Sequence, residues 1–371
     1  MKNVPVTIGF VAALLLASGA QAEDITIDWQ QTGLKYGTGY LPKVASDGLT
    51  SLVSIAQTGT GFSSLEDMTG TYPTELSMSW TAYHYLYSPP QSTPQVGHAP
   101  SIALVQAVNA GVDNLIEVHQ GGQDNGGALW YQLASASDPL PNKINWSAAN
   151  PYDEGYNPTV AADLNGPSPL VSTIVEVHQA GVDISALYYH VGVLTLGTSP
   201  SIVWGPSTEI NSGLNQGYAP TVSIANNLAI LVAQGTSGAL WYSIGVVDTS
   251  TSTIEWSKPD VYTSGYNPSI SVFGDGVDEF FGSGSGRVVV EAHQGDKGTG
   301  PLLYRTGILG GAAPTSIKWT PSSNVSYSNG CYPSVALSFT EVDYNLAVNE
   351  THSSACSEAA TLYASLGDLV E

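Results

Sequence analysis

Basic residues are scarce in this chain of 371 residues, which has 9 lysines and arginines against 31 aspartates and glutamates. The formal net charge is −22 at pH 7, and a protein this acidic repels phosphate backbones and anionic lipid surfaces. We therefore expect neither a nucleic-acid partner nor a membrane-surface partner. This charge does not exclude calcium or an uncharged ligand.

Charged residues of both signs make up only 11% of the chain, whereas 42% of the residues are hydrophobic. A chain of this composition can bury a core, so it is not an acidic disordered segment. Long apolar runs are also missing after the amino terminus, where no segment approaches the roughly 18 uninterrupted apolar residues of a membrane-spanning helix. We expect a globular chain without a membrane span.

The amino terminus has the pattern of a secretory signal peptide. Lys2 precedes an apolar run over residues 6–17, and Ala20 and Ala22 flank Gln21 after it. This arrangement fits the small-x-small site that signal peptidase cleaves; a buried helix over the apolar run is the alternative. We predict a signal peptide over residues 1–22 and a single mature domain over residues 23–371, located in the periplasm or secreted.

One short phrase, Gly-Tyr-x-Pro or a close variant, occurs six times. Its copies are Gly39-Tyr40-Leu41-Pro42, Gly97-His98-Ala99-Pro100, Gly155-Tyr156-Asn157-Pro158, Gly217-Tyr218-Ala219-Pro220, Gly265-Tyr266-Asn267-Pro268 and Gly330-Cys331-Tyr332-Pro333. The prolines follow one another at intervals of 58, 58, 62, 48 and 65 residues. A near-constant period indicates repeated structural units, and six such units fill the mature chain.

Each unit is predicted to contain four short strands. In the fourth unit an Asn226-Asn227 pair, which tolerates the positive φ of a hairpin turn, separates two apolar runs. The third strand carries a Leu-aromatic-Tyr motif, here Leu240-Trp241-Tyr242, and the fourth carries Ile-x-Trp, here Ile254-Glu255-Trp256. In the first unit we assign Tyr85-Leu86-Tyr87 to the fourth strand. The pattern predicts successive antiparallel hairpins.

Four-stranded antiparallel units in radial repetition are typical of a β-propeller. We therefore predict an all-β, six-bladed β-propeller. The sixth unit lacks an Ile-x-Trp strand, and a spare copy of that motif stands at residues 25–29. We expect this segment to complete the last blade as its outermost strand, because an unpaired sheet edge would otherwise be exposed. A β-sandwich array and an open solenoid are the alternative architectures.

The only two cysteines, Cys331 and Cys356, fall in the sixth unit. Cys331 replaces the tyrosine of the repeated phrase, and Cys356 lies in the loop predicted between the second and third strands. In a propeller blade these two loops emerge on the same face, so the thiols can meet. Because export leads to an oxidising compartment, we predict a disulfide between them.

Three units end their second strand with the motif Glu-x-His-Gln. The pairs are Glu117 and His119, Glu176 and His178, and Glu291 and His293. Residues two apart on a strand point to the same side, so each pair can share a pocket, and a ligand or metal site is one interpretation. We favour a structural role, because polar atoms buried between units must be paired.

A departure from the repeat points to a ligand site. Residues 58–74 are predicted to form a long loop on one face of the first unit, and long loops inside compact domains are often binding loops or lids. The candidate ligand-binding residues are Phe62, Glu66, Asp67 and Tyr72 in this loop and, as a second set, the phrase tyrosines Tyr156, Tyr218 and Tyr266. A packed structural role for those tyrosines is the simpler alternative.

Motifs of several enzyme classes are absent. The chain has no Gly-x-Ser-x-Gly, no His-Glu-x-x-His, no phosphate-binding loop and no Ser-x-Asp-x-Gly-x-x-Trp box of the sialidase propellers. Acidic turns such as Asp47-Gly48 lack EF-hand spacing. We therefore predict no catalytic residue, no cofactor and no metal ligand, and calcium is left as an open hypothesis.

Three blocks carry a family resemblance: Tyr-Asp-Glu-Gly-Tyr-Asn-Pro at residues 152–158, Val-Glu-Val-His-Gln at 175–179 and Leu-Tyr-Tyr at 187–189. They resemble the Val-Glu-Val-His-Gln and Leu-Trp-Tyr repeats of uncharacterised bacterial secreted proteins, over nearly the whole mature chain, and this resemblance implies no known activity. The general architecture also resembles six-bladed lectin propellers. Fucose-binding members use Arg, Glu and Trp between blades, whereas the only arginines here are Arg287 and Arg305, so six equivalent fucose sites are not expected.

These observations favour an exported, lectin-like binding module that recognises a glycan or an extracellular protein through loops on one face. One alternative is a carbohydrate-active enzyme, a glycosidase or lyase, whose carboxylates Glu66 and Asp67 meet at the central funnel. The other is a structural envelope protein that interacts with other proteins.

Overall fold

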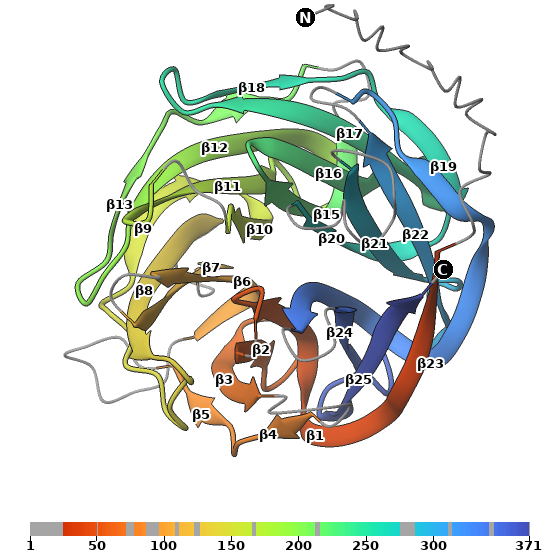
Figure 1. The fold of residues 1–371 in the computed structure, drawn as a ribbon, viewed down its shortest axis with the longest axis horizontal. Coiled ribbons are helices and arrows are strands. Elements are labelled where there is room, and N and C mark those ends of the chain that lie inside the picture. Colours follow the sequence, from red (N-terminus) through yellow and green to blue (C-terminus); the bar gives the residue numbers. More distant parts are fainter. Residues whose placement is uncertain are drawn as a thin grey trace, which may run out of the picture.

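A computed structural model describes residues 25–49, 51–71, 78–86, 96–107, 111–121, 127–164, 168–211, 216–274, 286–310, 314–340 and 345–370. The predicted signal peptide and Tyr72 lie outside these residues. The described chain is all-β, as predicted, apart from a short 3-10 helix at Thr236–Gly238. Its strands are arranged around a centre in the order of the sequence (Figure 1). The described residues contain no helix long and apolar enough to cross a membrane.

The first three units pair their strands in antiparallel order. The first contains β1 (Thr26–Ser46), β2 (Ser51–Gln57), β3 (Ser63–Thr71), β4 (Ser79–Trp80) and β5 (His84–Tyr85). The second contains β6 (Val96–Ala107), β7 (Val112–Gln120), β8 (Ala128–Ser137) and β9 (Asn150–Glu154). The third contains β10 (Tyr156–Ala162), β11 (Val171–Gln179), β12 (Ser185–Thr195), β13 (Ser201–Trp204) and β14 (Thr208–Glu209).

The remaining units follow the same order. The fourth contains β15 (Gln216–Ala225), β16 (Leu228–Gln234), β17 (Ala239–Asp248), β18 (Thr253–Trp256) and β19 (Asp260–Ser264). The fifth contains β20 (Tyr266–Phe273), β21 (Gly286–Gln294), β22 (Gly300–Gly310) and the first part of β23 (Lys318–Thr340). The sixth contains the second part of β23, β24 (Asn345–Ser353) and β25 (Ala360–Val370).

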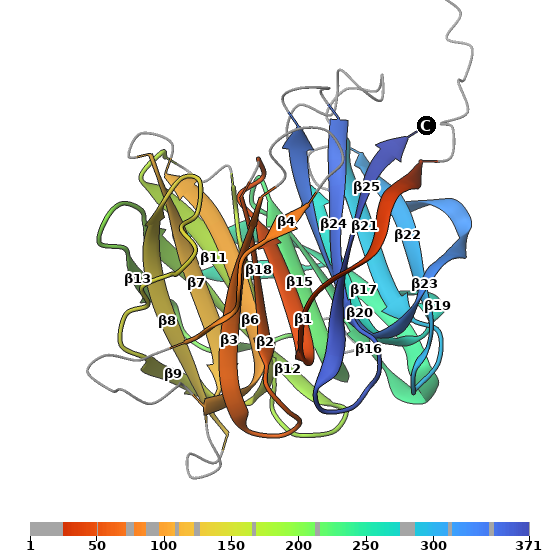
Figure 2. The same ribbon diagram turned by 90° about the horizontal axis from the view of Figure 1, so that it is seen from below.

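The amino-terminal strand β1 belongs to two units. Its first part, residues 26–39, pairs antiparallel with β25, and its second part, residues 40–46, pairs with β2. Figure 2 shows β1 lying beside β25 at the end of the chain. The predicted position of residues 25–29 next to the last strand agrees with this pairing, in which Thr26 lies opposite Val370 and Trp29 opposite Gly367.

The repeated phrase makes the same backbone irregularity in all six copies. Strand register shifts at each phrase, and the third residue has a φ between 46° and 56° in Leu41, Ala99, Asn157, Ala219, Asn267 and Tyr332. Positive φ is costly for most side chains, so the phrase is a shared structural device. The phrases lie opposite the ends of the second strands, and we call this side of the molecule the phrase face.

Hydrophobic residues form clusters between successive units rather than one central core. For example, Val177 of the third unit packs with Trp241 of the fourth, and Leu52 of the first unit packs with Leu366 of the sixth. The other clusters join the first and second, second and third, fourth and fifth, and fifth and sixth units. Burial of apolar area between neighbouring sheets therefore holds the units together.

Two predictions for the first unit were wrong. Residues 58–74 are not a long loop, because β3 occupies Ser63–Thr71 and pairs with β2 from Gln57 opposite Leu65 to Ser51 opposite Thr71. The loop prediction was wrong because this third strand reads Leu-Glu-Asp at residues 65–67, where the second, third and fourth units have Leu-aromatic-Tyr. The fourth-strand assignment of residues 85–87 was also misplaced, since Trp80 pairs with Gly70 as Trp256 pairs with Gly245 in the fourth unit.

The predicted disulfide is confirmed. Cys331 and Cys356 are bonded, with their Cα atoms 5.3 Å apart. The bond joins the repeated phrase of β23 to the loop between β24 and β25, on the phrase face, and braces the unit that the amino-terminal strand also joins.

Candidate functional site

Buried glutamate–histidine pairs recur at the end of the second strand in four units. In each pair the histidine Nδ1 lies within hydrogen-bond distance of the glutamate carboxylate, at 2.9 Å for Glu117 and His119, 3.1 Å for Glu176 and His178, 3.0 Å for Glu291 and His293, and 3.0 Å for Glu350 and His352. Sequence reasoning missed the fourth pair, because it stands in Glu-Thr-His-Ser rather than Glu-x-His-Gln. The pairing supports the predicted structural role of these residues.

The glycine that opens the repeated phrase makes room for the histidine of the same unit. A Cβ atom on Gly155 would lie 2.5 Å from Cδ2 of His178, and one on Gly265 would lie 2.3 Å from Cδ2 of His293. Side chains cannot approach so closely without a shift, so the phrase and the histidine depend on one another. We call the four buried glutamate–histidine pairs, with the phrase glycines beside them, the buried polar frame.

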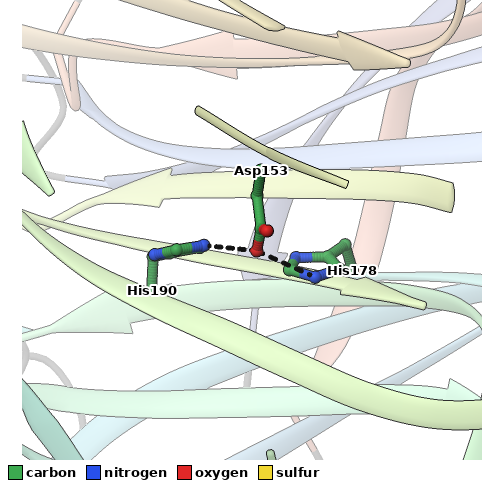
Figure 3. A group of neighbouring side chains, drawn as sticks. All are labelled: Asp153, His178 and His190. Atoms are coloured by element: carbon green, nitrogen blue, oxygen red, sulfur yellow. Dashed lines mark hydrogen bonds and ion pairs between the residues drawn. The ribbon is translucent and has the colours of Figure 1, made fainter. Parts of the chain in front are cut away.

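Asp153 of the second unit and His190 of the third unit add to this frame. Asp153 of β9 lies between the frame histidine, His178 of β11, and His190 of β12 (Figure 3). Oδ2 of Asp153 is 2.8 Å from Nε2 of His190 and 3.4 Å from Nε2 of His178. Strand pairing brings His190 into place, because it stands directly opposite Glu176.

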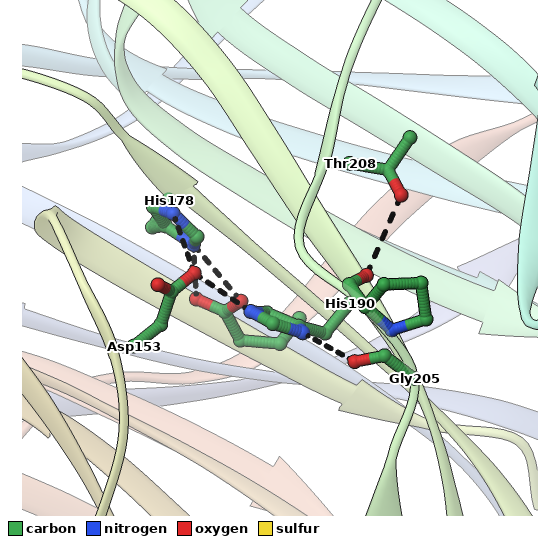
Figure 4. Close-up of polar contacts among 7 residues, drawn as sticks. Asp153, His178, His190, Gly205 and Thr208 are labelled. Carbon is green, nitrogen blue, oxygen red and sulfur yellow. Dashed lines mark hydrogen bonds and ion pairs between the residues drawn. The ribbon is translucent and has the colours of Figure 1, made fainter.

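The other ring nitrogens of both histidines have acceptors of their own. Nδ1 of His178 is 3.1 Å from the Glu176 carboxylate, and Nδ1 of His190 is 2.9 Å from the backbone carbonyl of Gly205 (Figure 4). With Nδ1 acting as donor in each ring, the neutral tautomer leaves the Nε2 lone pair free. Nε2 of both rings faces Asp153, and the protonated form of His190 donates a hydrogen bond to its carboxylate.

The charges of this cluster are coupled. Burial raises the pKa of Asp153, but hydrogen bonds from His190 and Ser207 outweigh it and hold that pKa well below its usual range. Burial lowers the pKa of His190, but its hydrogen bond to Asp153 and the charge of Glu176 outweigh that effect and raise it. Asp153 is therefore a carboxylate at neutral pH.

A pocket of about 350 Å³ opens beside the cluster on the phrase face. Its lining includes Asp153, Glu154, Tyr156, Tyr188 and Ser207. The ring of Tyr188 stacks on His178 with an interplanar angle of 12°, and Asp153 is 24% exposed. We call this the seam pocket, because its walls come from the second and third units.

A second pocket, of about 110 Å³, lies where the six phrases meet at the centre. The hydroxyls of Tyr40 and Tyr332 are 2.7 Å apart there, and Tyr218 also contributes to the wall. Lys43 faces this pocket from the position that serine or threonine occupies in the five other units. Burial lowers the pKa of Lys43 to about 8.

The predicted ligand-binding residues that the structure describes do not come together in one site. Phe62 lies in the turn before β3, with its ring 5.8 Å from that of His98. Glu66 and Asp67 are buried within β3, so they form no exposed platform and line neither pocket. Their carboxyl groups have pKa values raised by burial, to about 7 for each.

The three phrase tyrosines have different surroundings. Tyr156 lines the seam pocket, Tyr218 lines the central pocket, and the hydroxyl of Tyr266 packs near Gly238. Tyr156 is therefore the predicted ligand residue that the structure places beside the aspartate–histidine cluster.

Sequence reasoning missed Asp153 and His190 as site residues. Asp153 lies in one of the blocks that carried the family resemblance. His190 directly follows the Leu-Tyr-Tyr motif, at a position held by Gln132, Ser243 and Arg305 in the second, fourth and fifth units. Aligning the units would have identified the histidine as a singular residue.

Oxygen ligands of the type that calcium prefers gather on the opposite side of the molecule. Carboxylate oxygens of Asp47, Asp113 and Asp138 all lie within 4.8 Å of one another. Burial raises the pKa of Asp47 to about 6 and that of Asp113 to about 7. The group contains no nitrogen ligand, and the calcium hypothesis stays a prediction.

No protein-family model matches the chain, and no curated protein matches it in sequence. Among solved structures, the hemagglutinin-neuraminidase ectodomain of parainfluenza virus 5 is similar over 93% of this chain and 86% of its own, with a TM-score of 0.55 and 7% identity. The same viral protein with the ligand DANA gives a TM-score of 0.53 at 7% identity, over 94% and 95% of the two chains.

Trypanosoma rangeli sialidase matches over 92% of this chain but 59% of its own, with a TM-score of 0.49 and 8% identity. Identities this low make the two viral structures evidence for the fold alone. The predicted propeller class is confirmed at that level: this chain has the fold of the sialidase-like β-propellers.

Proposed function

We propose that the chain is an exported, closed six-bladed β-propeller that binds a neutral glycan in the seam pocket. The observation that carries this proposal is the composition of the pocket wall. Tyr156 and Tyr188 offer aromatic surface, and Asp153, Glu154 and Ser207 offer hydrogen-bonding oxygen atoms around about 350 Å³. Sugars present both apolar C–H faces and hydroxyls, so they suit a pocket that is partly aromatic and partly polar.

The charge of the protein narrows the ligand class. A net charge of −22 disfavours sialylated or sulfated glycans, and the carboxylates at the pocket accept hydrogen bonds from neutral hydroxyls. The predicted signal peptide and the disulfide are consistent with an extracytoplasmic location, where glycans are abundant ligands. A solved structure with this fold is a hemagglutinin-neuraminidase by name, which supports a carbohydrate-related role without assigning an activity.

The enzyme alternative required the carboxylates of Glu66 and Asp67 to meet at the central funnel. Glu66 and Asp67 are buried in β3 rather than at the central funnel, and the described residues that line the central pocket include no carboxylate. An assay for the release of reducing sugar from neutral polysaccharides should accordingly give no turnover.

The test is a glycan array of neutral and sialylated sugars with the purified mature protein, followed by calorimetry with the best neutral ligand. We expect Tyr188→Ala to weaken binding by at least about tenfold. Tyr363→Ala is the matched control, because Tyr363 occupies the equivalent position beside His352 in the sixth unit. Equal binding by wild type and a folded Tyr188→Ala variant, or a preference for sialylated sugars, would overturn the proposal.

A further inference from the structure

We propose that Asp153, His178 and His190 bind one divalent transition-metal ion, with zinc the best fit, at the floor of the seam pocket. This inference goes beyond glycan binding and does not depend on it. It depends on the donor atoms, on their support by neighbouring groups, and on the absence of the same set from the other described units.

The donor set is chemically suited to zinc. Two imidazole nitrogens and one carboxylate oxygen, with an open fourth position, are a frequent ligand set of accessible zinc sites. Imidazole nitrogen favours zinc and its neighbours in the first transition series over calcium and magnesium, which prefer oxygen ligands. The cluster thus differs in kind from the all-carboxylate group of Asp47, Asp113 and Asp138.

The ligand atoms are already gathered. The candidate ligand atoms of Asp153, His178 and His190 all lie within 4.8 Å of one another, and Oδ2 of Asp153 is 2.8 Å and 3.4 Å from the two histidine Nε2 atoms. A tetrahedral ion with bonds of about 2.0–2.2 Å holds its ligand atoms roughly 3.3 Å apart. Small side-chain movements suffice to reach that spacing.

The groups behind the histidines are those that zinc sites use. A metal-binding histidine commonly donates its second N–H to a carboxylate or a backbone carbonyl, which fixes its tautomer and orientation. Nδ1 of His178 faces Glu176, and Nδ1 of His190 faces the carbonyl of Gly205 (Figure 4). Both rings are therefore set to present Nε2 as a ligand.

The other units are internal comparisons. At the seam between the fourth and fifth units, Thr263 of β19 occupies the position of Asp153, and Arg305 of β22 occupies that of His190. His293, the counterpart of His178, has its Nε2 3.2 Å from the side-chain amide of Asn324. The arginine carries a positive charge and has no acceptor atom, so this arrangement opposes a bound cation.

The seam between the fifth and sixth units also lacks the added ligands. Ser328 and Ser365 stand at the positions of Asp153 and His190. In the fifth and sixth units, the glutamate–histidine pair therefore occurs without the two added metal ligands. If Asp153 and His190 served only to stabilise a buried histidine, the other pairs would need them too.

The pocket gives the ion access and a free coordination position. Asp153 is 24% exposed, while the His178 and His190 side chains are 2% and 5% exposed. The seam pocket adjoins Asp153 and His178, so a water molecule or a ligand hydroxyl can complete the coordination from that side.

The test uses the mature protein without a histidine tag, stripped of metal and then titrated with zinc chloride alone. We expect one zinc ion per chain by calorimetry and by elemental analysis after dialysis, and a higher Tm on zinc addition. Cobalt chloride should give the visible absorption of a tetrahedral site, and calcium chloride at the same concentration should not raise the Tm.

Two variants and one control test the assignment. Asp153→Asn and His190→Gln should each weaken zinc binding by at least about 100-fold, whereas His293→Ala in the fifth unit should bind as wild type does. If His190→Gln unfolds, Asp153→Asn remains informative, because it keeps shape and sits at a partly exposed position. Wild-type protein that binds no zinc, or Asp153→Asn protein that binds it normally, would overturn the metal site and leave the glycan proposal standing.

Discussion

The third and fifth units place the same buried frame in two different chemical settings. In both, a histidine Nδ1 meets a glutamate, and a tyrosine from the preceding unit stacks on a tryptophan: Tyr152 on Trp204 at 5.3 Å and Tyr262 on Trp319 at 4.9 Å. In the fifth unit, Arg305 packs over that tryptophan and donates to the carbonyl of Tyr262.

The third unit has His190 where the fifth has Arg305, and the unit before each contributes Asp153 and Thr263, respectively, at equivalent positions. Two substitutions thus separate a structural seam from a cluster of metal ligands. The comparison teaches that the repeat determines the scaffold, while the departures from it determine the chemistry.

The largest expected effect comes from removing the start of β1, which pairs with the last strand of the chain. A mature protein that begins at residue 30 loses Ile25 and Ile27 from the cluster between the fifth and sixth units. It also loses the hydrogen bond from Ile27 N–H to the Tyr304 hydroxyl. Loss of two buried isoleucines costs on the order of 5 kcal/mol.

We therefore expect aggregation or a strong drop in Tm, measured by size-exclusion chromatography and calorimetry. A truncated protein that melts with the full mature chain would contradict the role of β1 in the last unit.

The second-largest expected effect comes from moving the proposed zinc ligands to the equivalent positions beside His293. Thr263→Asp combined with Arg305→His should give the seam between the fourth and fifth units the ligands of the seam between the second and third, and raise the zinc content from one ion to two per chain. Thr263→Asp also replaces the hydroxyl that accepts a hydrogen bond from the Asn324 amide with a carboxylate. Elemental analysis after dialysis measures the stoichiometry, and Arg305→His alone is the control that should stay at one ion. A folded double variant with one ion would weaken the comparison.

A smaller effect tests the glutamate–histidine pairs that the third and fifth units share. Glu176→Ala and Glu291→Ala each leave a buried histidine without its carboxylate, which should cost about 1–3 kcal/mol of unfolding free energy. Urea denaturation of the metal-free proteins should give similar losses for both, and exposed Glu255→Ala should give none. A Glu176→Ala variant of full stability would show that the pair serves only a ligand.

The smallest effect concerns Asp67, which occupies the place of the motif tyrosine in the first unit. Burial raises its pKa to about 7, while Lys143 opposes and Glu66 adds to that shift. The folded state therefore holds a proton that the unfolded state has lost above about pH 4, so this group reduces stability as pH rises from 4 to 7.

Asp67→Asn should remove that loss, with about 1–3 kcal/mol higher stability at pH 8 and little change at pH 4. Urea midpoints at the two pH values are the measurement. An equal difference between variant and wild type at both pH values would contradict the assignment.

Much of the scaffold was predictable because it repeats. The Gly-x-x-Pro phrases, the Leu-aromatic-Tyr strands and the spare Ile-x-Trp copy at residues 25–29 predicted the strand order, and the Cys331–Cys356 bond followed from it. The first unit was mispredicted where Leu65-Glu66-Asp67 replaces the aromatic motif, since a buried strand with two carboxylates gives no hydrophobic signal.

The site was harder to predict, because it depends on singular residues that meet across a seam. Asp153 and His178 come from different units, and their proximity follows from how neighbouring sheets pack rather than from spacing in the chain. The repeated pairs were also the stronger pattern, and they led to the structural frame. The chemistry lies in His190 and Asp153, which occur once each.

The most direct test of the central claim is a crystal structure of the protein soaked in zinc chloride, with anomalous diffraction measured on both sides of the zinc absorption edge. We predict one strong anomalous peak about 2.0–2.2 Å from Nε2 of His178, Nε2 of His190 and a carboxylate oxygen of Asp153. The absence of a peak there, or a peak only at Asp47, Asp113 and Asp138, would contradict it.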